Sequence, residues 1–219
     1  MTLGTSSSSV TSVAAIPSEQ PSEQTVPGPR ERILTAARDL FFSHGYRATS
    51  MSRIADASQM TTPNLYWHFP SKQDLLGAVL REVYRSFLDE LAEAVPFTGS
   101  PDERLRAYIW HYVSIQLRDT TEDMTHGYHT LASSLKDDDQ AQLAEIRRTI
   151  HHMLRDIVTD GIEAGLFHVT DLTSALTAVE SACEYTFTWY HPSGRLHRDE
   201  IAAGYVEVAL RIVGFRKQS

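Results

Sequence analysis

The strongest constraint on the fold is a series of apolar residues at helical spacing, broken repeatedly by residues that begin a helix. From residue 30 onward, apolar side chains recur every three or four positions, as at Ile33, Ala37 and Phe41, and no segment alternates convincingly as a strand would. Serine, threonine or aspartate stands before most of these runs, where its side chain can accept a hydrogen bond from a free N–H group of the first turn. The sequence therefore predicts an all-α fold of about nine helices.

Caps, prolines and glycines set the expected helix boundaries. Thr61 and Pro63 begin a short helix, Ser71 with Asp74 resembles a capping box, and Gly165 stands at a helix end. We expect helices over about 30–44, 51–57, 62–69, 71–95, 101–117, 120–135, 138–165, 171–190 and 198–215. Residues 1–28 are rich in Ser, Thr, Pro and Gln and have few large apolar side chains, so we expect a disordered tail there.

The charge of the 219-residue chain is −8 in total but is unevenly distributed. Residues 30–72 hold six basic and three acidic side chains, an excess of +3, whereas residues 73–219 hold fourteen basic and 23 acidic ones. The basic segment can therefore approach a polyanion, while phosphates repel the acidic remainder. No apolar run approaches the roughly 20 residues of a membrane span, no secretory signal is recognisable, and Cys183 has no cysteine to pair with. We therefore expect a cytoplasmic protein with no membrane partner.

The two short helices expected over 51–57 and 62–69 are separated by a tight turn, which is the arrangement of a helix-turn-helix. Residues 33–80, ILTAARDLFFSHGYRATSMSRIADASQMTTPNLYWHFPSKQDLLGAVL, resemble the DNA-binding domain of the TetR family of transcriptional regulators. The matching elements are Ala37, Phe41, Gly45-Tyr46, Thr49-Ser50, Ile54-Ala55, Leu65-Tyr66, His68-Phe69 and Ser71-Lys72. The resemblance implies a DNA-binding domain over 29–74 and a helical ligand-binding and dimerisation domain over 75–219.

The sequence departs from the family pattern in the turn of the helix-turn-helix. The family usually has glycine there, and this chain has Gln59. Gln59 or its neighbour must then adopt a strained backbone conformation, which costs about 1 kcal/mol.

The second short helix of the motif is the one expected to enter the major groove, where base edges display a readable pattern of donors and acceptors. Asn64 can pair with an adenine edge, and residues such as Arg53 and Lys72 can contact phosphates. The predicted DNA-binding residues are Tyr46, Thr49, Arg53, Thr61, Thr62, Asn64, Tyr66, Trp67, His68 and Lys72. The alternative is a three-helix packing unit that binds no DNA. Leu65 and Phe69 are expected in the core, and Trp67 fits either interpretation.

The second half of the chain is rich in aromatic residues and histidine, a composition that suits a pocket between facing helices of a bundle. The predicted ligand-binding residues are Tyr108, Trp110, His111, Tyr112, Met124, Tyr128, His129, His152, Glu184, Tyr185 and Trp189. Taken singly, each aromatic residue also fits a packed core. The ending WYHPSGRLHRDEIAAGYVEVALRIVG resembles TetR members of which several respond to acyl-CoA or related lipid-like compounds, so the resemblance implies an effector of this kind.

Metal binding and catalysis find little support in the sequence. His126 and His129 have a spacing that can ligate zinc, but no definite third ligand accompanies them, so we assign no metal and no cofactor. The serines and histidines lack the context of a nucleophile elbow or triad, and no glycine-rich loop follows a strand. We therefore do not expect an enzyme.

The last two helices are expected to form the interface of a homodimer, because small and apolar residues allow close helix approach. The predicted interface residues are Ala175, Ala178, Val179, Ala182, Thr186, Ala202, Tyr205, Val206, Ala209, Ile212 and Val213. The alternative is that these faces pack within their own subunit.

Together these features predict a ligand-responsive regulator, by default a repressor. Its two reading helices would enter successive major grooves of a near-palindromic double-stranded operator, about one helical turn apart. The helix over 71–94 would act as the lever between DNA and a small-molecule effector. The alternative from another class is a helical small-molecule-binding protein or enzyme with no regulatory DNA binding.

Overall fold

The computed structural model describes residues 27–118, 120 and 131–217, and this part of the chain contains helices and no strand. The helices are α1 (Pro29–His44), α2 (Met51–Ala57), α3 (Thr62–His68), α4 (Lys72–Ala94), α5 (Pro101–Arg118), α7 (Asp137–Glu163), α8 (Leu172–Glu184) and α9 (Arg198–Ile212). The predicted all-α class is therefore confirmed. Most of the predicted tail over 1–28 and of the predicted helix over 120–135 lies outside the described residues.

Four of the helix caps predicted from the sequence form where they were expected. The side chains of Ser50, Thr61, Ser71 and Asp171 accept hydrogen bonds from backbone N–H groups two or three residues into α2, α3, α4 and α8. Each bond satisfies one of the N–H groups that a helix leaves without a partner at its start.

The segment after α8 differs from the prediction of one helix to Tyr190. The α-helix ends at Glu184, and Thr186–Thr188 form a 3₁₀ turn. The hydroxyls of Thr186 and Thr188 donate to the carbonyls of Cys183 and Tyr185 at 2.8 and 2.7 Å. Such side-chain bonds compete with continued α-helix, and aromatic and β-branched residues favour helix less than alanine does.

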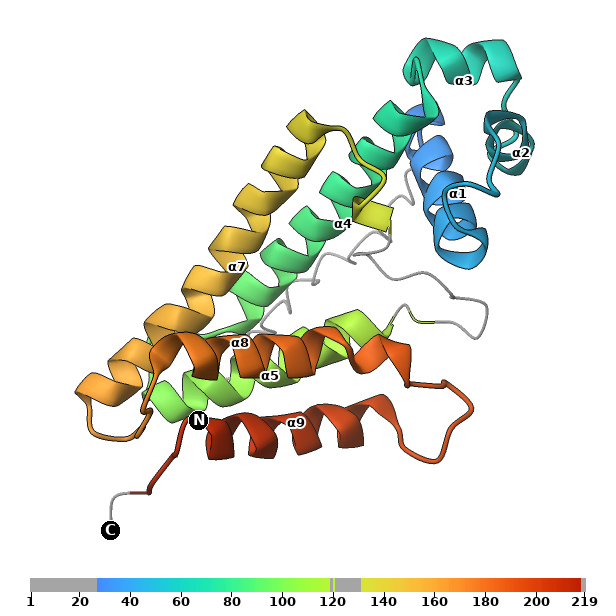
Figure 1. The fold of residues 1–219 in the computed structure, drawn as a ribbon. Helices are drawn as coiled ribbons and strands as arrows, with labels where there is room; N and C mark the ends of the chain where they lie inside the picture. The colour runs from blue at the N-terminus through green and yellow to red at the C-terminus, as the bar shows by residue number, and fades with distance from the viewer. Residues whose placement is uncertain (1–26, 119, 121–130, 218–219) are drawn as a thin grey trace, which may run out of the picture.

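The helices build an elongated molecule with α1, α2 and α3 gathered at one end of the long helix α4 (Figure 1). At the other end, α5, α8 and α9 pack together, and α7 runs alongside α4 (Figure 1). None of the described helices combines the length and apolar character needed to cross a membrane.

The buried side chains form two separate hydrophobic cores. The first joins α1, α2, α3 and the start of α4, and it also takes in Leu131 and Leu135 from the segment that leads into α7 and Leu143 of α7 itself. The second joins α5, α8, α9, Leu91 of α4 and the rest of α7, from Ile150 onward. Both α4 and α7 therefore run from one core into the other.

Candidate DNA interface and ligand pocket

Helix α3 lies at the surface at the far end of the molecule (Figure 1). Leu65 is its buried residue and fixes it to the first core, while Asn64, Tyr66 and Trp67 are exposed. Trp67 is 79% exposed, which is unusual for so large an apolar ring in a monomer without a partner surface. The helix therefore presents a polar and aromatic face that no described part of the chain covers.

The turn between α2 and α3 has the strained geometry expected from the sequence. Gln59 has φ of 57°, and it is the non-glycine residue with positive φ in the described chain. The turn is held by a hydrogen bond from the Met60 N–H to the Ala55 carbonyl at 2.8 Å. It is held also by the buried Ser58 hydroxyl, which donates to the Ile54 carbonyl at 2.8 Å. These bonds offset the strain and keep the helix-turn-helix geometry without glycine.

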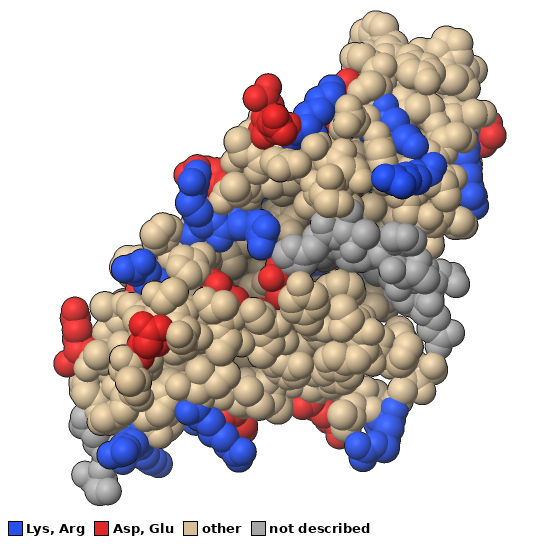
Figure 2. Space-filling model, viewed as in Figure 1, with Lys and Arg blue, Asp and Glu red and all other residues tan. Residues whose placement is uncertain are grey.

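The cations of the DNA-binding end lie on elements other than α3, which itself carries no Lys or Arg, and Figure 2 shows them below the tan tip of the molecule. Arg53 is exposed on α2, and its guanidinium lies 2.9 Å from the His44 ring nitrogen. Thr61 is exposed, whereas Tyr46, Thr62 and His68 are half-buried at the edge of the same surface. Because α2 contacts α3, Arg53 can meet a phosphate while α3 meets base edges.

Two of the predicted DNA-binding residues, Thr49 and Lys72, also make hydrogen bonds within the chain, and their assignment as DNA contacts stays a prediction. Thr49 is 1% exposed, and its hydroxyl donates to the carbonyls of Gly45 and Leu40 at 2.9 and 3.2 Å. The Lys72 ammonium donates to the carbonyls of Tyr46 and Thr49 at 2.8 and 2.9 Å, and it lies 4.3 Å from the centre of the Tyr46 ring. Lys72 thus joins α4 to the loop between α1 and α2, and desolvation lowers its pKa.

A pocket of about 330 Å³ lies among α4, α5, α7, α8 and the 3₁₀ turn, and a hollow with charged side chains at its margin is visible in Figure 2. Its apolar lining consists of Val83, Tyr84, Phe87, Tyr112, Ala144, Ile150 and Phe187, and its polar lining of Gln116, Arg147, Arg148, His151, Glu180 and Glu184. Apolar walls with a few polar groups are typical of a site for a small organic molecule.

Two side-chain pairs between α7 and α8 cross one side of this pocket. His151 Nδ1 lies 2.7 Å from Glu180 Oε1, and Arg147 lies 3.8 Å from Glu184 Oε1. The side chain of Gln116 donates to the Glu184 backbone carbonyl at 2.5 Å. The Glu180 and Glu184 carboxylates are less exposed than their partners, so they lie deeper, and the side chains of Arg147 and His151 lie nearer solvent.

The predicted ligand-binding residues are only partly brought together. Tyr112 and Glu184 line the pocket, and burial raises the pKa of the Tyr112 hydroxyl well above its usual range. Tyr108 is buried behind Tyr112 and donates to the Ile150 carbonyl at 3.2 Å, so it supports the wall without lining it.

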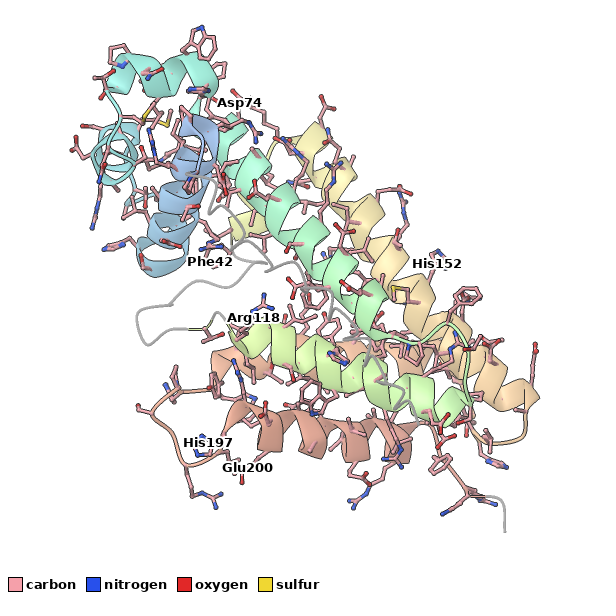
Figure 3. All side chains as sticks on the ribbon, turned by 180° about the vertical axis from the view of Figure 1, so that it is seen from behind. Phe42, Asp74, Arg118, His152, His197 and Glu200 are labelled. Carbon is pink, nitrogen blue, oxygen red and sulfur yellow. The ribbon has the colours of Figure 1, made fainter. Side chains whose placement is uncertain are left out.

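The other predicted residues do not line this pocket. Trp110 and His111 face shallow grooves beside α9, while Tyr185 and Trp189 are exposed, with Trp189 stacked on Tyr205. His152 is exposed on the outer side of α7 (Figure 3). The neighbouring His151, which was not predicted, lines the pocket instead. Met124, Tyr128 and His129 lie outside the described residues.

Sequence analysis missed several lining residues, above all Phe87, Arg147, Arg148, His151 and Glu180. A signal was present on α7, because Ala144, Arg147, Arg148 and His151 share one face at helical spacing. The sequence does not show which face of α7 meets α4, so from spacing alone Arg147 and Arg148 fit a solvent-exposed surface equally well.

The face predicted for dimerisation packs largely inside the chain. The buried members are Ala175, Val179, Thr186, Ala202, Val206, Ala209 and Val213, which belong to the interior formed where α8 and α9 pack together with α5. Ala178 is exposed, and Ala182, Tyr205 and Ile212 are half-buried. The exposed small or apolar residues of these helices are offset by about one position and include Ser181, Gly204 and Val208. The spacing therefore selected largely the inner face of α8 and α9, and the assignment of these helices to a dimer interface stays a prediction.

Within the described residues, no group of three His, Cys, Asp or Glu side chains is placed to hold a metal ion. His126 and His129 lie outside the described residues.

Comparison with known proteins agrees with this geometry. Residues 33–79 match the model of bacterial regulatory proteins of the tetR family, and residues 98–213 match the tetracyclin repressor-like C-terminal domain. The chain is 25% identical over 184 residues to the HTH-type transcriptional repressor KstR2 of Mycolicibacterium smegmatis, which covers 83% of this chain and 88% of that protein.

Solved structures give the same result. A tetR-family regulatory protein from Rhodococcus RHA1 superposes with a TM-score of 0.79 at 28% identity, over 88% of this chain and all of that one. The structure of AibR in complex with isovaleryl coenzyme A and operator DNA has a TM-score of 0.74 at 26% identity, over 83% of this chain and 97% of that one. The C-terminal family model alone spans more than half of the sequence, and the chain belongs to the TetR family of transcriptional regulators.

Proposed function

We propose that this protein is a ligand-responsive transcriptional repressor that binds a near-palindromic operator as a homodimer and is released by a small, mostly apolar effector. The observation that carries the proposal is α3, which is fixed to the core through Leu65 and leaves Asn64, Tyr66 and Trp67 exposed, with Arg53 exposed on the neighbouring helix α2. An α-helix of this kind fits the major groove, and the basic residues beside it can neutralise phosphates.

Dimerisation is part of the proposal because a single α3 reads too few base pairs to select an operator. Two copies related by a two-fold axis read two half-sites about one helical turn apart. The exposed Ala178 and Ser181 on α8 and Gly204 and Val208 on α9 supply small or apolar surface for such an interface. Small side chains there permit close approach of the paired helices.

The pocket favours an effector with an apolar body and an anionic end, as in a short acyl-CoA. The rings of Phe87, Tyr112 and Phe187 can surround an acyl chain, while Arg147 and Arg148 lie on the more exposed side, where they can meet phosphate oxygens. The similarity to AibR, whose structure holds isovaleryl coenzyme A, supports the same class of effector.

The DNA-binding part of the proposal is tested by selecting bound sequences from a random DNA library and measuring their affinity against salt concentration. We expect a near-palindromic sequence whose affinity falls steeply with salt, because phosphate contacts release counterions. Asn64→Ala should weaken operator binding by about tenfold with little effect on random DNA. Gln142→Ala, at an exposed position on α7, is the matched control. Failure to enrich any sequence would favour the alternative, a helical small-molecule-binding protein without regulatory DNA binding.

The effector part is tested by calorimetry with isovaleryl-CoA, octanoyl-CoA and free coenzyme A. We expect acyl-CoA binding that Phe87→Ala weakens, together with reduced operator affinity in its presence. Equal binding of free coenzyme A and of the acyl forms would show that the apolar lining does not select the acyl chain.

A further inference from the structure

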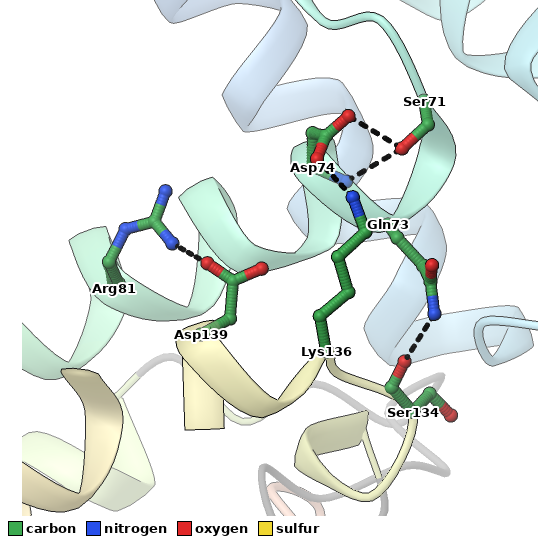
Figure 4. A network of polar contacts seen from close by, with 7 residues as sticks. All are labelled: Ser71, Gln73, Asp74, Arg81, Ser134, Lys136 and Asp139. Atoms are coloured by element: carbon green, nitrogen blue, oxygen red, sulfur yellow. Dashed lines mark hydrogen bonds and ion pairs between the residues drawn. The ribbon is translucent and has the colours of Figure 1, made fainter. Parts of the chain in front are cut away.

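The start of α7 is joined to the start of α4 by a cluster of polar contacts (Figure 4). The Lys136 ammonium lies 2.6 Å from Asp74 Oδ1, and the guanidinium of Arg81 pairs with the carboxylate of Asp139. A third contact runs from the Gln73 side chain to the Ser134 backbone carbonyl at 3.4 Å. These contacts connect residues about 60 positions apart in the sequence, so they stabilise the packing of α7 against α4 and not either helix by itself.

Close packing accompanies the ion pairs. A Cβ placed on Gly77 would lie 2.5 Å from the Asp139 carboxylate, closer than real Cβ atoms approach. Glycine at 77 therefore lets the first turn of α7 lie directly against α4. The Arg81 and Asp139 side chains are 25% and 13% exposed, so this pair is better shielded from solvent than the Lys136–Asp74 pair, at 45% and 37%.

The same region lies between the two cores. Leu143 of α7 belongs to the core of the DNA-binding helices, and Ile150, two turns later, belongs to the other core. The pocket residues Ala144, Arg147 and His151 occupy the intervening and following turns. On α4, Leu80 belongs to the first core and Leu91 to the second, with Val83 and Phe87 in the pocket between them.

We infer that Asp74, Gly77, Arg81, Lys136 and Asp139 form an α4–α7 latch that holds the DNA-binding helices in the orientation required by the operator and transmits pocket occupancy to them. The inference rests on the proposed function and adds the route of regulation for its pocket. A ligand inserted between α4 and α7 exerts force on both helices at the boundary between the cores. Because the latch joins the helices on the DNA side of that boundary, they cannot separate there without moving α3, which ends four residues before α4 begins.

The electrostatics of the latch agree with this geometry. The hydrogen bond from Lys136, followed by that from Ser71, lowers the pKa of Asp74. Asp74 also lies in the capped first turn of α4, so one carboxylate serves both the helix start and the contact to α7.

The test compares Asp139→Ala with Asp138→Ala. Both changes remove an aspartate from the first turn of α7 and alter its helix dipole alike, but Asp138 is exposed and has no part in the latch. Gly77→Ala opens the same contact by sterics, because the added methyl displaces the Asp139 carboxylate while alanine favours helix over glycine. Circular dichroism and thermal unfolding establish that each variant is folded.

We expect Asp139→Ala and Gly77→Ala to weaken operator binding by about fivefold or more. Without the latch, the DNA-binding helices adopt several orientations, and only a fraction of the molecules has the one that binds the operator. Random-sequence DNA should bind within about twofold of the wild type, since nonspecific contacts do not require both α3 helices in register. Amide hydrogen exchange over 72–80 in DNA-free protein should be faster in both variants and unchanged in Asp138→Ala. The latch variants should bind isovaleryl-CoA or octanoyl-CoA with wild-type affinity. The bound acyl-CoA should, however, no longer lower their affinity for the operator.

The inference is overturned if Asp139→Ala and Gly77→Ala match Asp138→Ala in both operator affinity and hydrogen exchange. That outcome is separate from failure of the proposed function, which would show as absence of operator preference in the wild type. If neither acyl-CoA binds the wild type, the effector class is wrong and the effector-free measurements alone decide the role of the latch.

Discussion

Lys72 gives the sharpest test of a predicted DNA contact that also makes hydrogen bonds within the chain. Its ammonium donates to two carbonyls, those of Tyr46 and Thr49, at 2.8 and 2.9 Å and lies against the Tyr46 ring. Lys72→Met keeps the length of the side chain but leaves both carbonyls without this donor. Two charge-assisted bonds contribute about 1.5 kcal/mol each, and partial solvent access reduces the sum, so we expect a loss of about 2 kcal/mol in the free energy of unfolding.

The assay is thermal unfolding together with the salt dependence of operator binding. For a chain of this size, about 2 kcal/mol corresponds to a fall in Tm of about 4–8 °C. The slope of log affinity against log salt should stay near the wild-type value, because the two bonds that the structure gives the Lys72 ammonium are made to the protein. Arg53→Met is the matched comparison, since Arg53 is exposed and the loss of its two copies in a homodimer should reduce the slope by about 1.8 with little change in Tm. The reasoning is refuted if Lys72→Met leaves Tm unchanged and reduces the salt slope as Arg53→Met does.

Two further predictions concern backbone strain and thiol reactivity. Gln59→Gly removes the steric strain of a side chain at φ of 57° and should raise the free energy of unfolding by about 0.5–1 kcal/mol. Gln59→Val should lower the free energy of unfolding, because a β-branched side chain is more strained at this φ. Equal Tm values for the two variants would contradict the strain argument. Burial raises the pKa of the Cys183 thiol to about 12, so a thiol reagent at neutral pH should modify it only after denaturant is added, and rapid labelling of the native protein would contradict its burial.

Local interactions explain which parts of the fold were predictable. Ser50, Thr61, Ser71 and Asp171 cap helices through bonds to residues two or three positions away, so sequence alone is enough to place them. The strained turn at Gln59 was likewise found by comparing one residue with a family pattern. Where no such bond forms, the boundary was less well placed: α7 begins at Asp137 without a side-chain cap, not at Asp138 or Asp139.

The functional faces were harder to predict because they depend on which neighbour a helix meets. Trp110 and Tyr112 are both aromatic and two positions apart on α5, yet only Tyr112 reaches the pocket. His151 and His152 are adjacent and chemically identical, and α8 turns the first inward by presenting Glu180 at 2.7 Å. Helical spacing defines a stripe of residues, but packing decides whether that stripe faces a core, a cavity or solvent.

The position of the pocket between two cores explains how a small ligand can act on a distant helix. A ligand inside a single core would be resisted by close packing on every side, and its effect would remain local. Here α4 and α7 each anchor in both cores, through Leu80 and Leu91 on one helix and Leu143 and Ile150 on the other, and among the described helices these two line the pocket at the boundary between the cores. A change in their separation therefore tilts one core relative to the other, and the length of α4 converts that tilt into displacement of α3. This arrangement depends on contacts between α4 and α7, which are about 60 residues apart in the sequence. Helical spacing could therefore identify α4 as the connecting helix but could not show that α7 packs against it.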